Sequence, residues 1–176
     1  MKLSFEDRLK AFQDDPQKRL AKAGVAKGMQ VADLGAGRGF YSLLSAGIVG
    51  ATGVVYSVEP DSSRTEVITR RAAEERIDSI KVMATGAEDL SGIPSSSIDL
   101  AFALNSLHHF RDKQIAFSEV SRVLKNGGRF YIKDMIWHWY SWHGTRREDI
   151  ANLPSAGFSE KTVTVSGSTL EASFTK

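Results

Sequence analysis

Three glycines alternate with other residues in the stretch VADLGAGRGF, which covers positions 31–40 and includes Gly35, Gly37 and Gly39. An apolar run precedes these glycines and an apolar run of helical length follows them, so they predict a turn between a strand and a helix. Glycine allows positive φ angles and close approach of a ligand, and the N-terminus of the following helix offers unpaired N–H groups. The stretch therefore predicts either a ligand-binding loop or a tight turn that binds nothing.

The spacing of the glycines narrows the class of ligand. It is Gly-x-Gly-x-Gly, whereas dinucleotide sites use Gly-x-Gly-x-x-Gly, and the Lys and Ser/Thr of a phosphate-binding P-loop are absent. Glu59 ends the next predicted strand, 20 residues beyond Gly39, and Pro60 favours an extended backbone at that point. A carboxylate in this place can accept hydrogen bonds from both hydroxyls of a ribose. Alone, Glu59 reads as a solvated acid, but together with the loop it predicts a ribose site.

Several side chains near the predicted strand ends could accept a proton. They are His108, His109, Asp134, His138 and His143. For the adjacent pair His108 and His109, a structural role at a strand-to-helix turn competes with a catalytic role. A metal site is disfavoured, because the histidine spacing matches none of the common metal-binding signatures and no acid completes one. We therefore predict no metal and take His108 and His109 as the catalytic candidates.

The segment IWHWYSWHG, residues 136–144, contains all three tryptophans of the chain. Its aromatic side chains could belong to the core, a membrane anchor, a stacking surface or a pocket wall. A membrane anchor is disfavoured because the run is short and no basic amphipathic helix surrounds it. The segment follows a predicted strand at the carboxyl edge of the sheet, so we predict that it partly lines or covers an apolar or aromatic acceptor site; a core role stays open for Ile136 and one tryptophan. The predicted substrate-side residues are Trp137, His138, Trp139, Tyr140 and Trp142.

These side chains need strands and helices that bring them together. The predicted strands are 29–35, 53–58, 80–83, 98–104 and 129–133, and the predicted helices are 17–23, 40–49, 63–76 and 112–125. Asp15 and Pro16 predict the start of the first helix, and Ser63 with Glu66 predicts a capping box on the third. Helical spacing turns one set of apolar side chains inward: Val67, Ile68, Ala72, Ala73, Ile115, Val120, Val123 and Leu124.

The order of these elements predicts the fold. Strands alternate with helices, which indicates a doubly wound, mostly parallel, Rossmann-like α/β sheet with helices on both faces. Beyond Arg146 a weak helix is interrupted by Pro154, and segments 158–165 and 169–174 flank a Ser-Gly-Ser turn. They predict an antiparallel C-terminal hairpin. Ligands of such sheets bind outside the carboxyl ends of the strands, where the strand order reverses.

Composition limits the class of protein. The 176 residues suit a single domain, with an N-terminal helical segment (1–24), a core (25–134) and a substrate-side segment with the hairpin (135–176). The net charge of +2 gives no strong attraction to nucleic acid or membrane, and the arginines of segment 63–76 interleave with glutamates, as on a solvated, ion-paired face. The charged N-terminus differs from a signal peptide, and no apolar run approaches the roughly 18 residues of a membrane span. We expect a cytoplasmic protein without a membrane span.

The sequence resembles the class I S-adenosylmethionine-dependent methyltransferases. The stretch Asp-Leu-Gly-Ala-Gly-Arg-Gly (33–39), followed by Val-Tyr-Ser-Val-Glu (55–59), carries the likeness. Residues 87–90 resemble the adenine-side loop of that family, residues 98–100 with 107–109 its fourth-strand motif, and residues 119–128 its helix-to-fifth-strand stretch. The likeness covers roughly residues 25–134 and is greatest to the small methyltransferases of ubiquinone and menaquinone biosynthesis.

The resemblance implies a role for individual residues. Asp33 and the backbone of Gly35 would lie by the methionine part of the cofactor, with Gly37 and Gly39 clearing space for it. Glu59 would hold the ribose hydroxyls, and Asn105 would lie near the methionine amino group and the mouth of the substrate site. The adenine would be bordered by Gly86, Ala87 and Glu88. Many relatives have Asp where this chain has Gly86, so Glu88 or backbone atoms would have to replace that contact.

The resemblance also implies a reaction. S-adenosylmethionine would donate its methyl group by in-line displacement to a small-molecule acceptor, leaving S-adenosylhomocysteine, and the protein would align the reactants and exclude water. Two alternatives stay open: methylation of RNA or protein, and a non-catalytic subunit that binds the cofactor. The glycine spacing disfavours a nicotinamide-dependent dehydrogenase, and a homo-oligomer is left open.

Overall fold

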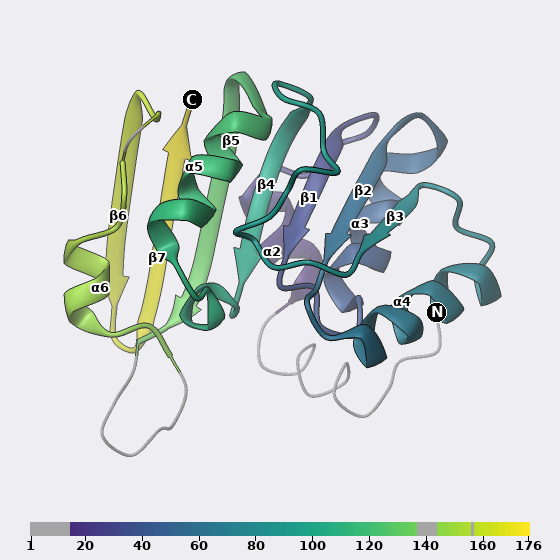
Figure 1. The fold of residues 1–176 in the computed structure, drawn as a ribbon, viewed down its shortest axis with the longest axis horizontal. Helices are drawn as coiled ribbons and strands as arrows, with labels where there is room; N and C mark the ends of the chain where they lie inside the picture. The colour runs from purple at the N-terminus through teal and green to yellow at the C-terminus, as the bar shows by residue number, and fades with distance from the viewer. Residues whose placement is uncertain (1–14, 137–143, 156) are drawn as a thin grey trace.

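The computed structural model describes residues 15–136, 144–155 and 157–176, and within them seven strands form one sheet (Figure 1). The strand order is β3-β2-β1-β4-β5-β7-β6. Strands β1 to β5 pair in parallel, whereas β7 is antiparallel to both β5 and β6. The strands are β1 (Gln30–Leu34), β2 (Val54–Val58), β3 (Ile80–Met83), β4 (Ile98–Leu104), β5 (Leu124–Met135), β6 (Glu160–Ser166) and β7 (Thr169–Thr175).

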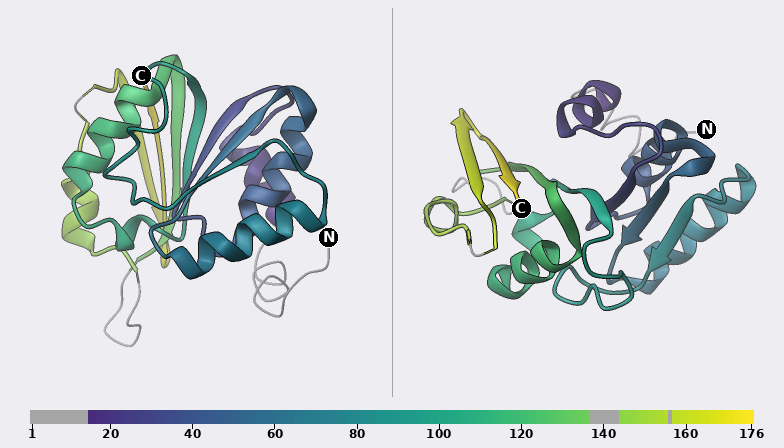
Figure 2. Two further views of the ribbon diagram at one scale, coloured as in Figure 1. Left: turned by 45° about the vertical axis from the view of Figure 1, so that its right-hand side comes forward. Right: turned by 90° about the horizontal axis from the view of Figure 1, so that it is seen from above.

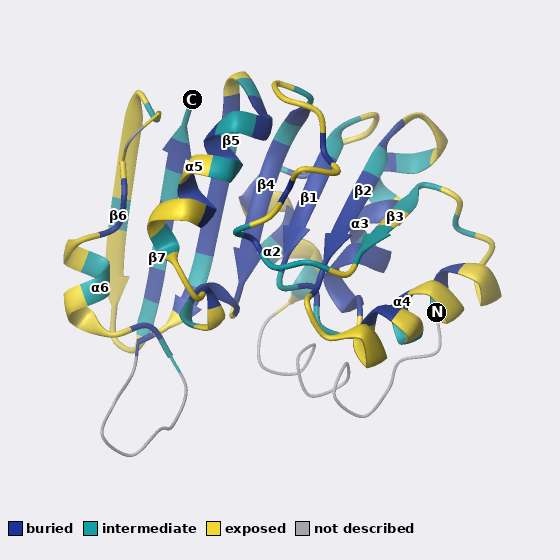
Figure 3. Cartoon of the chain, viewed as in Figure 1, coloured by how far each residue is buried: buried dark blue, intermediate teal, exposed yellow. Residues whose placement is uncertain are grey.

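Helices cover both faces of this sheet. They are α2 (Pro16–Ala23), α3 (Phe40–Val49), α4 (Ser62–Glu74), α5 (Lys113–Val123) and α6 (Arg147–Ala151), with short 3-10 turns η1 (Gly50–Thr52) and η2 (Leu107–His109). Helices α2 and α3 bury Leu20 and Phe40 in one apolar cluster, and α5 buries Phe117 in another. Figure 2 shows α2 and α5 on opposite sides of the sheet, and Figure 3 shows that β1 and β4 between them are buried. The predicted doubly wound, mostly parallel α/β fold is confirmed.

The strand order reverses at β1, which lies between β2 and β4. The chain leaves β1 toward β2 through α3, and it returns from β3 to the other side of β1 as β4. The loops after the carboxyl ends of β1, β2 and β4 therefore meet at one edge. This is the place where open α/β sheets bind ligands.

Helix α4 differs from its prediction in its cap and in its buried face. The helix starts at Ser62, and its N-cap is Asp61, whose Oδ1 accepts hydrogen bonds from Ser63 N (2.9 Å) and Ser63 Oγ (2.7 Å). The predicted capping box of Ser63 with Glu66 is therefore wrong, because the carboxylate of Asp61, two residues before Ser63, accepts from an N–H of the first turn. The buried side chains of α4 are Thr65, Ile68 and Ala72, whereas Val67 is half-buried and Ala73 is exposed.

Helix α5 has a similar shift at its start. Asp112 caps it by accepting from Ile115 N (3.0 Å), and the Ile115 side chain, predicted to face inward, is 51% exposed. Residues 116, 117 and 120 face the sheet instead, so the apolar stripe begins one position later. The helix ends at Val123, two residues before its predicted end, because Leu124 already pairs with Ile98 of β4.

The C-terminal hairpin is confirmed as β6 and β7, and β7 lies between β5 and β6. Four phenylalanines fix it to α5. The ring centroid of Phe117 lies 5.1 Å from that of Phe174 on β7 and 5.2 Å from that of Phe130 on β5, and Phe158 contacts Phe174 at 5.3 Å. The two pairs of Phe117 are edge-to-face, and ring pairs of this kind add to the free energy of apolar burial. The hairpin thereby extends the core beyond β5.

No helix among the described stretches is long and apolar enough to span a membrane.

Glu119 and Arg122 of α5 fasten this helix to the loop that follows β3. Arg122 donates to both oxygens of Glu119 (2.8 Å each) and to the carbonyl oxygens of Leu90 (2.8 Å) and Ile93 (3.1 Å), while Leu90 N donates to Glu119 (3.0 Å). The hydrogen bond from Arg122, followed by that from Leu90 N, lowers the pKa of Glu119 against the opposing effect of burial.

A lowered pKa in the folded state means that ionised Glu119 stabilises the fold above the pKa of the unfolded chain. This contribution is lost as the pH falls through the folded-state value. We expect Glu119→Gln to lower the free energy of unfolding by about 1 kcal/mol at pH 7. The difference from wild type should shrink as the pH falls below about 4. Urea unfolding of both proteins across this range measures it, and a difference that does not change with pH would contradict the assignment.

Candidate functional site

The glycine loop closes over the carboxyl ends of β1 and β2. Gly35, Gly37 and Gly39 have φ angles of 78°, 59° and 81°, which L side chains rarely adopt. Gly35 N and Ala36 N both donate to the carbonyl oxygen of Val58 at the end of β2, at 2.9 and 3.0 Å. The turn between strand and helix that the sequence predicts is therefore confirmed. Hydrogen bonds to the end of β2 fix the first two residues of this turn, Gly35 and Ala36.

The three glycines serve different purposes. A Cβ atom at Gly35 would come within 2.5 Å of Ser106 Cβ, and one at Gly39 would come within 2.9 Å of Ile68 Cγ1 on α4. Apart from its two chain neighbours, a Cβ atom at Gly37 would meet no atom within 4 Å in the part of the chain that the structure describes. Gly35 and Gly39 thus let protein side chains pack closely, and Gly37 borders open space. Within the protein the missing side chain of Gly39 makes room for Ile68, and its role toward a ligand stays a prediction.

Glu59 joins the glycine loop to the end of β2. Its carboxylate is almost fully buried, and Oε2 accepts a hydrogen bond from Gly37 N at 2.8 Å. Oε1 accepts from Asp61 N at 3.2 Å and lies 3.7 Å from Arg64 Nη1. A carboxylate offers about four acceptor sites, so Glu59 can hold the loop through one site and still accept hydrogen bonds from ligand hydroxyls. Glu59 and the glycine loop are thus joined by a direct contact, and the role of Glu59 in holding a ribose stays a prediction.

Asp33, near the carboxyl end of β1, belongs to a buried series of hydrogen-bonded polar side chains. Its Oδ2 accepts from Ser42 Oγ on α3 at 2.6 Å, and Ser42 Oγ lies 2.7 Å from Ser57 Oγ on β2. Because the Ser42 proton points to Asp33, Ser57 donates to Ser42, so the chain of hydroxyls ends on the carboxylate. Our sequence reasoning missed Ser42 and Ser57. The signal was a serine within each of two apolar stretches, FYSLLSAGIV and VVYSV.

The predicted adenine-side residues lie in the loop after β3. The Ala87 side chain is buried in the core, so only its backbone can border a ligand. Glu88 Oε1 accepts from Arg111 N (2.6 Å) and Asp112 N (3.2 Å), which fixes the start of α5. A Cβ atom at Gly86 would collide with the Glu88 carboxylate. An Asp at position 86 would also place a like charge beside Glu88, which disfavours Asp here as long as Glu88 keeps this position.

The loop after β4 touches both β5 and the glycine loop. Asn105 is exposed, has a left-handed φ of 56°, and donates from its N–H to the carbonyl oxygen of Lys133 at 2.7 Å. Non-glycine residues in this conformation are uncommon and occur often at functional sites. Ser106 is buried and donates from Oγ to the carbonyl oxygen of Leu34 at 2.6 Å. The loop that carries Asn105 is therefore fixed against the end of β1.

The two candidate histidines of η2 have different surroundings. The His108 side chain is 11% exposed, and its Nδ1 lies 2.9 Å from Oδ1 and 3.0 Å from Oδ2 of Asp134, at the carboxyl end of β5. His109 is exposed, with its ring centroid 4.0 Å from that of His108. The structure thus joins two of the candidate proton acceptors, His108 and Asp134, into one pair.

The predicted substrate-side residues Trp137, His138, Trp139, Tyr140 and Trp142 lie outside the described residues, as does His143. Both flanks of their segment are described. Ile136 and Thr145 form a parallel bridge, Thr145 N donates to the carbonyl oxygen of Met135 at 2.7 Å, and Thr145 Oγ1 donates to Asp134 Oδ2 at 2.8 Å. The chain therefore leaves and rejoins the described structure beside the His108–Asp134 pair.

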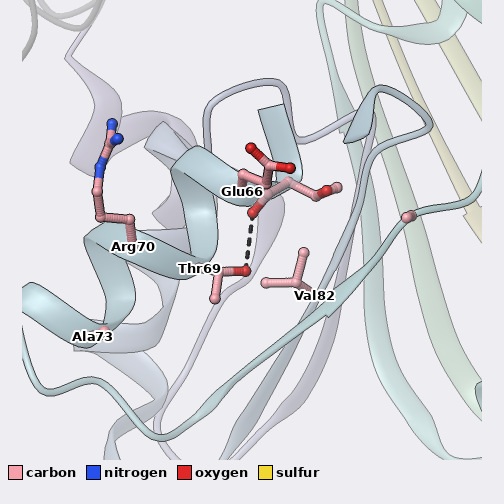
Figure 4. Close-up of a pocket in the computed structure, with 7 residues that line it drawn as sticks. Glu66, Thr69, Arg70, Ala73 and Val82 are labelled. Carbon is pink, nitrogen blue, oxygen red and sulfur yellow. Dashed lines mark hydrogen bonds between the residues drawn. The ribbon is translucent and has the colours of Figure 1, made fainter. Parts of the chain in front are cut away.

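An open groove of about 470 Å³ lies apart from these residues, between α4 and the edge strand β3 (Figure 4). Glu66, Arg70 and Ala73 of α4 line it together with Val82 of β3. Thr69 Oγ1 donates to the carbonyl oxygen of Thr65 (3.0 Å), so this hydroxyl is engaged within the helix. The groove shares no residue with the predicted cofactor site. Within the described ranges no three His, Asp or Glu side chains gather as a metal site.

The sequence of the chain is similar to those of known methyltransferases. Residues 32–132, more than half of the chain, match the family described as a methyltransferase domain. The ubiquinone/menaquinone biosynthesis C-methyltransferase UbiE of Laribacter hongkongensis is 32% identical over 120 residues, which cover 68% of this chain and 48% of that protein. The chain spans about half the length, or somewhat less, of the curated relatives it matches.

Two solved structures share the fold. A SAM-dependent methyltransferase from Aquifex aeolicus superposes with a TM-score of 0.77 at 21% identity, over 98% of each chain. Geranyl diphosphate C-methyltransferase from Streptomyces coelicolor, in complex with Mg²⁺, geranyl diphosphate and S-adenosyl-L-homocysteine, superposes with a TM-score of 0.72 at 18% identity. That match covers 95% of this chain and 80% of the other. At these identities the likeness shows the fold, including the antiparallel strands at the C-terminal end.

Proposed function

The chain belongs to the S-adenosylmethionine-dependent methyltransferase family, and on that premise we propose that it transfers a methyl group from S-adenosylmethionine to a small organic acceptor. The observation that carries the proposal is the open space at Gly37 beside the buried carboxylate of Glu59. A tight turn explains the positive φ of Gly37, but it does not explain why the space beside this glycine adjoins a buried carboxylate that still has acceptor sites to offer.

The residues present fit this cofactor. Bound S-adenosylmethionine supplies a methyl group that its sulfonium has already activated. Glu59 would accept hydrogen bonds from the ribose hydroxyls, and Gly37 would leave room for the ligand. Asp33 and Gly35 would lie by the methionine part, with Asn105 near its amino group. The backbone of Gly86, Ala87 and Glu88 would border the adenine. The protein then has to align the acceptor and exclude water.

The acceptor is proposed to be small and apolar or aromatic. The net charge of +2 supports this, because a macromolecular nucleic-acid substrate would favour a strongly basic protein. Two similar proteins are named for small-molecule chemistry, one for quinone biosynthesis and one for geranyl diphosphate. The tryptophan-rich segment stays a sequence prediction for the acceptor side, and its flanks Ile136 and Thr145 adjoin the His108–Asp134 pair.

Calorimetric titration of Glu59→Gln tests the cofactor site. The substitution keeps the shape of the side chain and removes its charge, so hydrogen bonds from the ribose hydroxyls weaken. We expect S-adenosylhomocysteine to bind about 1.5–3 kcal/mol less tightly, the usual value of hydrogen bonds to a charged group. Wild type should bind S-adenosylmethionine and S-adenosylhomocysteine and give no heat with NAD. Unchanged affinity in the variant would exclude Glu59 from the site, and heat from NAD alone would overturn the cofactor assignment.

The acceptor class is tested with methyl-labelled S-adenosylmethionine. The protein is incubated with small-molecule, RNA and protein fractions of a cell extract. We expect the label to appear in the small-molecule fraction. Label in RNA or protein instead would favour a macromolecular substrate, and cofactor binding without label in any fraction would favour a non-catalytic subunit.

A further inference from the structure

Asp134 is a fully buried carboxylate at the carboxyl end of β5. Its two oxygens accept from four donors. Oδ2 accepts from His108 N (3.0 Å) and Thr145 Oγ1 (2.8 Å), Oδ1 accepts from Met135 N (2.8 Å), and His108 Nδ1 lies within 3.0 Å of both oxygens. An ionised carboxylate accepts about four hydrogen bonds and donates none. The donors therefore fill its capacity, as a buried charge requires.

This arrangement decides which nitrogen of His108 carries the proton in the neutral ring. Nδ1 faces a group that only accepts, so Nδ1 must donate. The lone pair of the neutral imidazole is then on Nε2. A carboxylate that orients a histidine in this way prepares the other ring nitrogen to take up a proton. His108 also donates its backbone N–H to the same carboxylate, so both the ring and the chain are held by Asp134.

His108 is also joined to the two regions that the proposed reaction needs. It belongs to η2, which follows directly on Ser106, and Ser106 packs against Gly35 and binds the carbonyl oxygen of Leu34. On the other side, Asp134 binds Thr145, which pairs with Ile136. One continuous set of contacts therefore links the glycine loop, His108, Asp134 and the flanks of segment 137–143.

We propose that Asp134 is a positioning residue that holds His108 with Nε2 as proton acceptor, and that the methyl acceptor is consequently a molecule whose nucleophilic atom gives up a proton, such as a phenol or quinol. The inference deepens the proposed function and rests on it. The proton passes from the acceptor to His108 Nε2, while an electron pair of the acceptor forms the new bond to the methyl carbon. The electron pair of the broken carbon–sulfur bond stays on the sulfur.

Nitrogen-15 NMR of histidine-labelled protein tests the positioning role without any turnover. Long-range proton–nitrogen correlations near pH 9, above the usual titration range of histidine, distinguish the two neutral tautomers. We expect wild-type His108 to carry its proton on Nδ1. In Asp134→Asn the carboxamide presents N–H groups to the ring, so the population should move toward the Nε2–H tautomer. Should this variant not fold, the wild-type spectrum still decides, and an Nε2–H tautomer in wild type would overturn the proposal.

A matched control is Asp99→Asn. Asp99 on β4 accepts from Gln30 N (2.8 Å) and Lys125 Nζ (2.6 Å), at the end of the sheet away from the glycine loop. The substitution makes the same chemical change and should leave the His108 tautomer and methyl transfer unaltered. We expect Asp134→Asn to slow methyl transfer roughly 100-fold or more with unchanged affinity for S-adenosylhomocysteine. An unaltered tautomer and rate in Asp134→Asn would contradict the positioning role.

The acceptor class is tested on a probe panel of phenols and quinols against tertiary amines and thioethers, which have no proton to lose. Methylation of the phenols or quinols supports the inference, and methylation of only the tertiary amines or thioethers overturns it. If no member of the panel is methylated, the proposed acceptor class is wrong. The tautomer measurement then still tests the positioning role of Asp134. The failure of the inference and that of the proposed function are thereby distinguishable.

Discussion

Replacing Gly37 by Val is expected to weaken S-adenosylhomocysteine binding by roughly 100-fold or more, equivalent to about 2.7 kcal/mol. The added side chain would project into the open space that a Cβ atom at this position now leaves, next to Glu59. Because, apart from the two chain neighbours, no atom of the described residues lies within 4 Å of that Cβ position, the loss should come from collision with the ligand rather than from repacking. Calorimetric titration of wild type and variant measures the change.

Backbone strain must be separated from this collision, because Gly37 has a positive φ. Gly127 is a matched control, with a φ of 76° and open space at its Cβ position, at the opposite end of β5 from Asp134. Gly127→Val should cost a similar 1–3 kcal/mol or so of folding stability and leave binding unchanged. Gly37→Asn repeats the test with a residue that tolerates this conformation. Tight binding in both Gly37 variants would mean that the loop is only a turn.

The second large effect is expected from His108→Asn, which should lower the rate of methyl transfer by about 10²–10⁴-fold, the usual contribution of general acid–base catalysis. The Asn amide can still donate to Asp134 in place of Nδ1, so the hydrogen bond that fixes η2 survives while the Nε2 nitrogen is removed. Rates are measured under single-turnover conditions with an acceptor identified from labelled fractions.

Two further measurements show whether the lost rate reports catalysis. Thermal unfolding and S-adenosylhomocysteine affinity should stay close to wild type in His108→Asn, since the link to Asp134 is kept. His109→Asn should cost less activity, because Asp134 holds His108. Full activity in His108→Asn would leave His108 with a structural role only, the alternative that the sequence keeps open for this pair.

The sequence predicts those parts of the site that are local in the chain. The glycine turn, the strand that ends at Glu59 and the helix that follows Gly39 arise from short stretches whose residue types dictate their conformation. Parallel pairing of β1 with β2 then brings Glu59 to Gly37. The doubly wound order also follows from the alternation of strands and helices, because few topologies can bury both faces of such a sheet.

The contacts that the sequence does not reveal join residues far apart in the chain. Asp134 and His108 meet because β5 pairs with β4 and because η2 turns back over the end of β5. The residue types and their spacing in the sequence do not reveal the register in which β5 pairs with β4. Gly39 is similar: besides its positive φ, the close approach of Ile68 of α4, which lies 29 positions later, leaves no room for a side chain there. The predicted start of helix α4 was wrong for a local reason. Asp61 and Ser63 are both residue types that can cap a helix, and in the structure Asp61 accepts the capping hydrogen bond from Ser63 N.

The measurement that tests the site most directly is amide chemical-shift mapping of the wild-type protein during titration with S-adenosylhomocysteine. We predict that the largest shifts fall on Gly35, Gly37, Glu59 and Asn105, around the carboxyl ends of β1, β2 and β4. The α4–β3 groove, represented by Thr69 and Val82, should change little. Shifts concentrated in that groove, with Gly37 and Glu59 unmoved, would contradict the account.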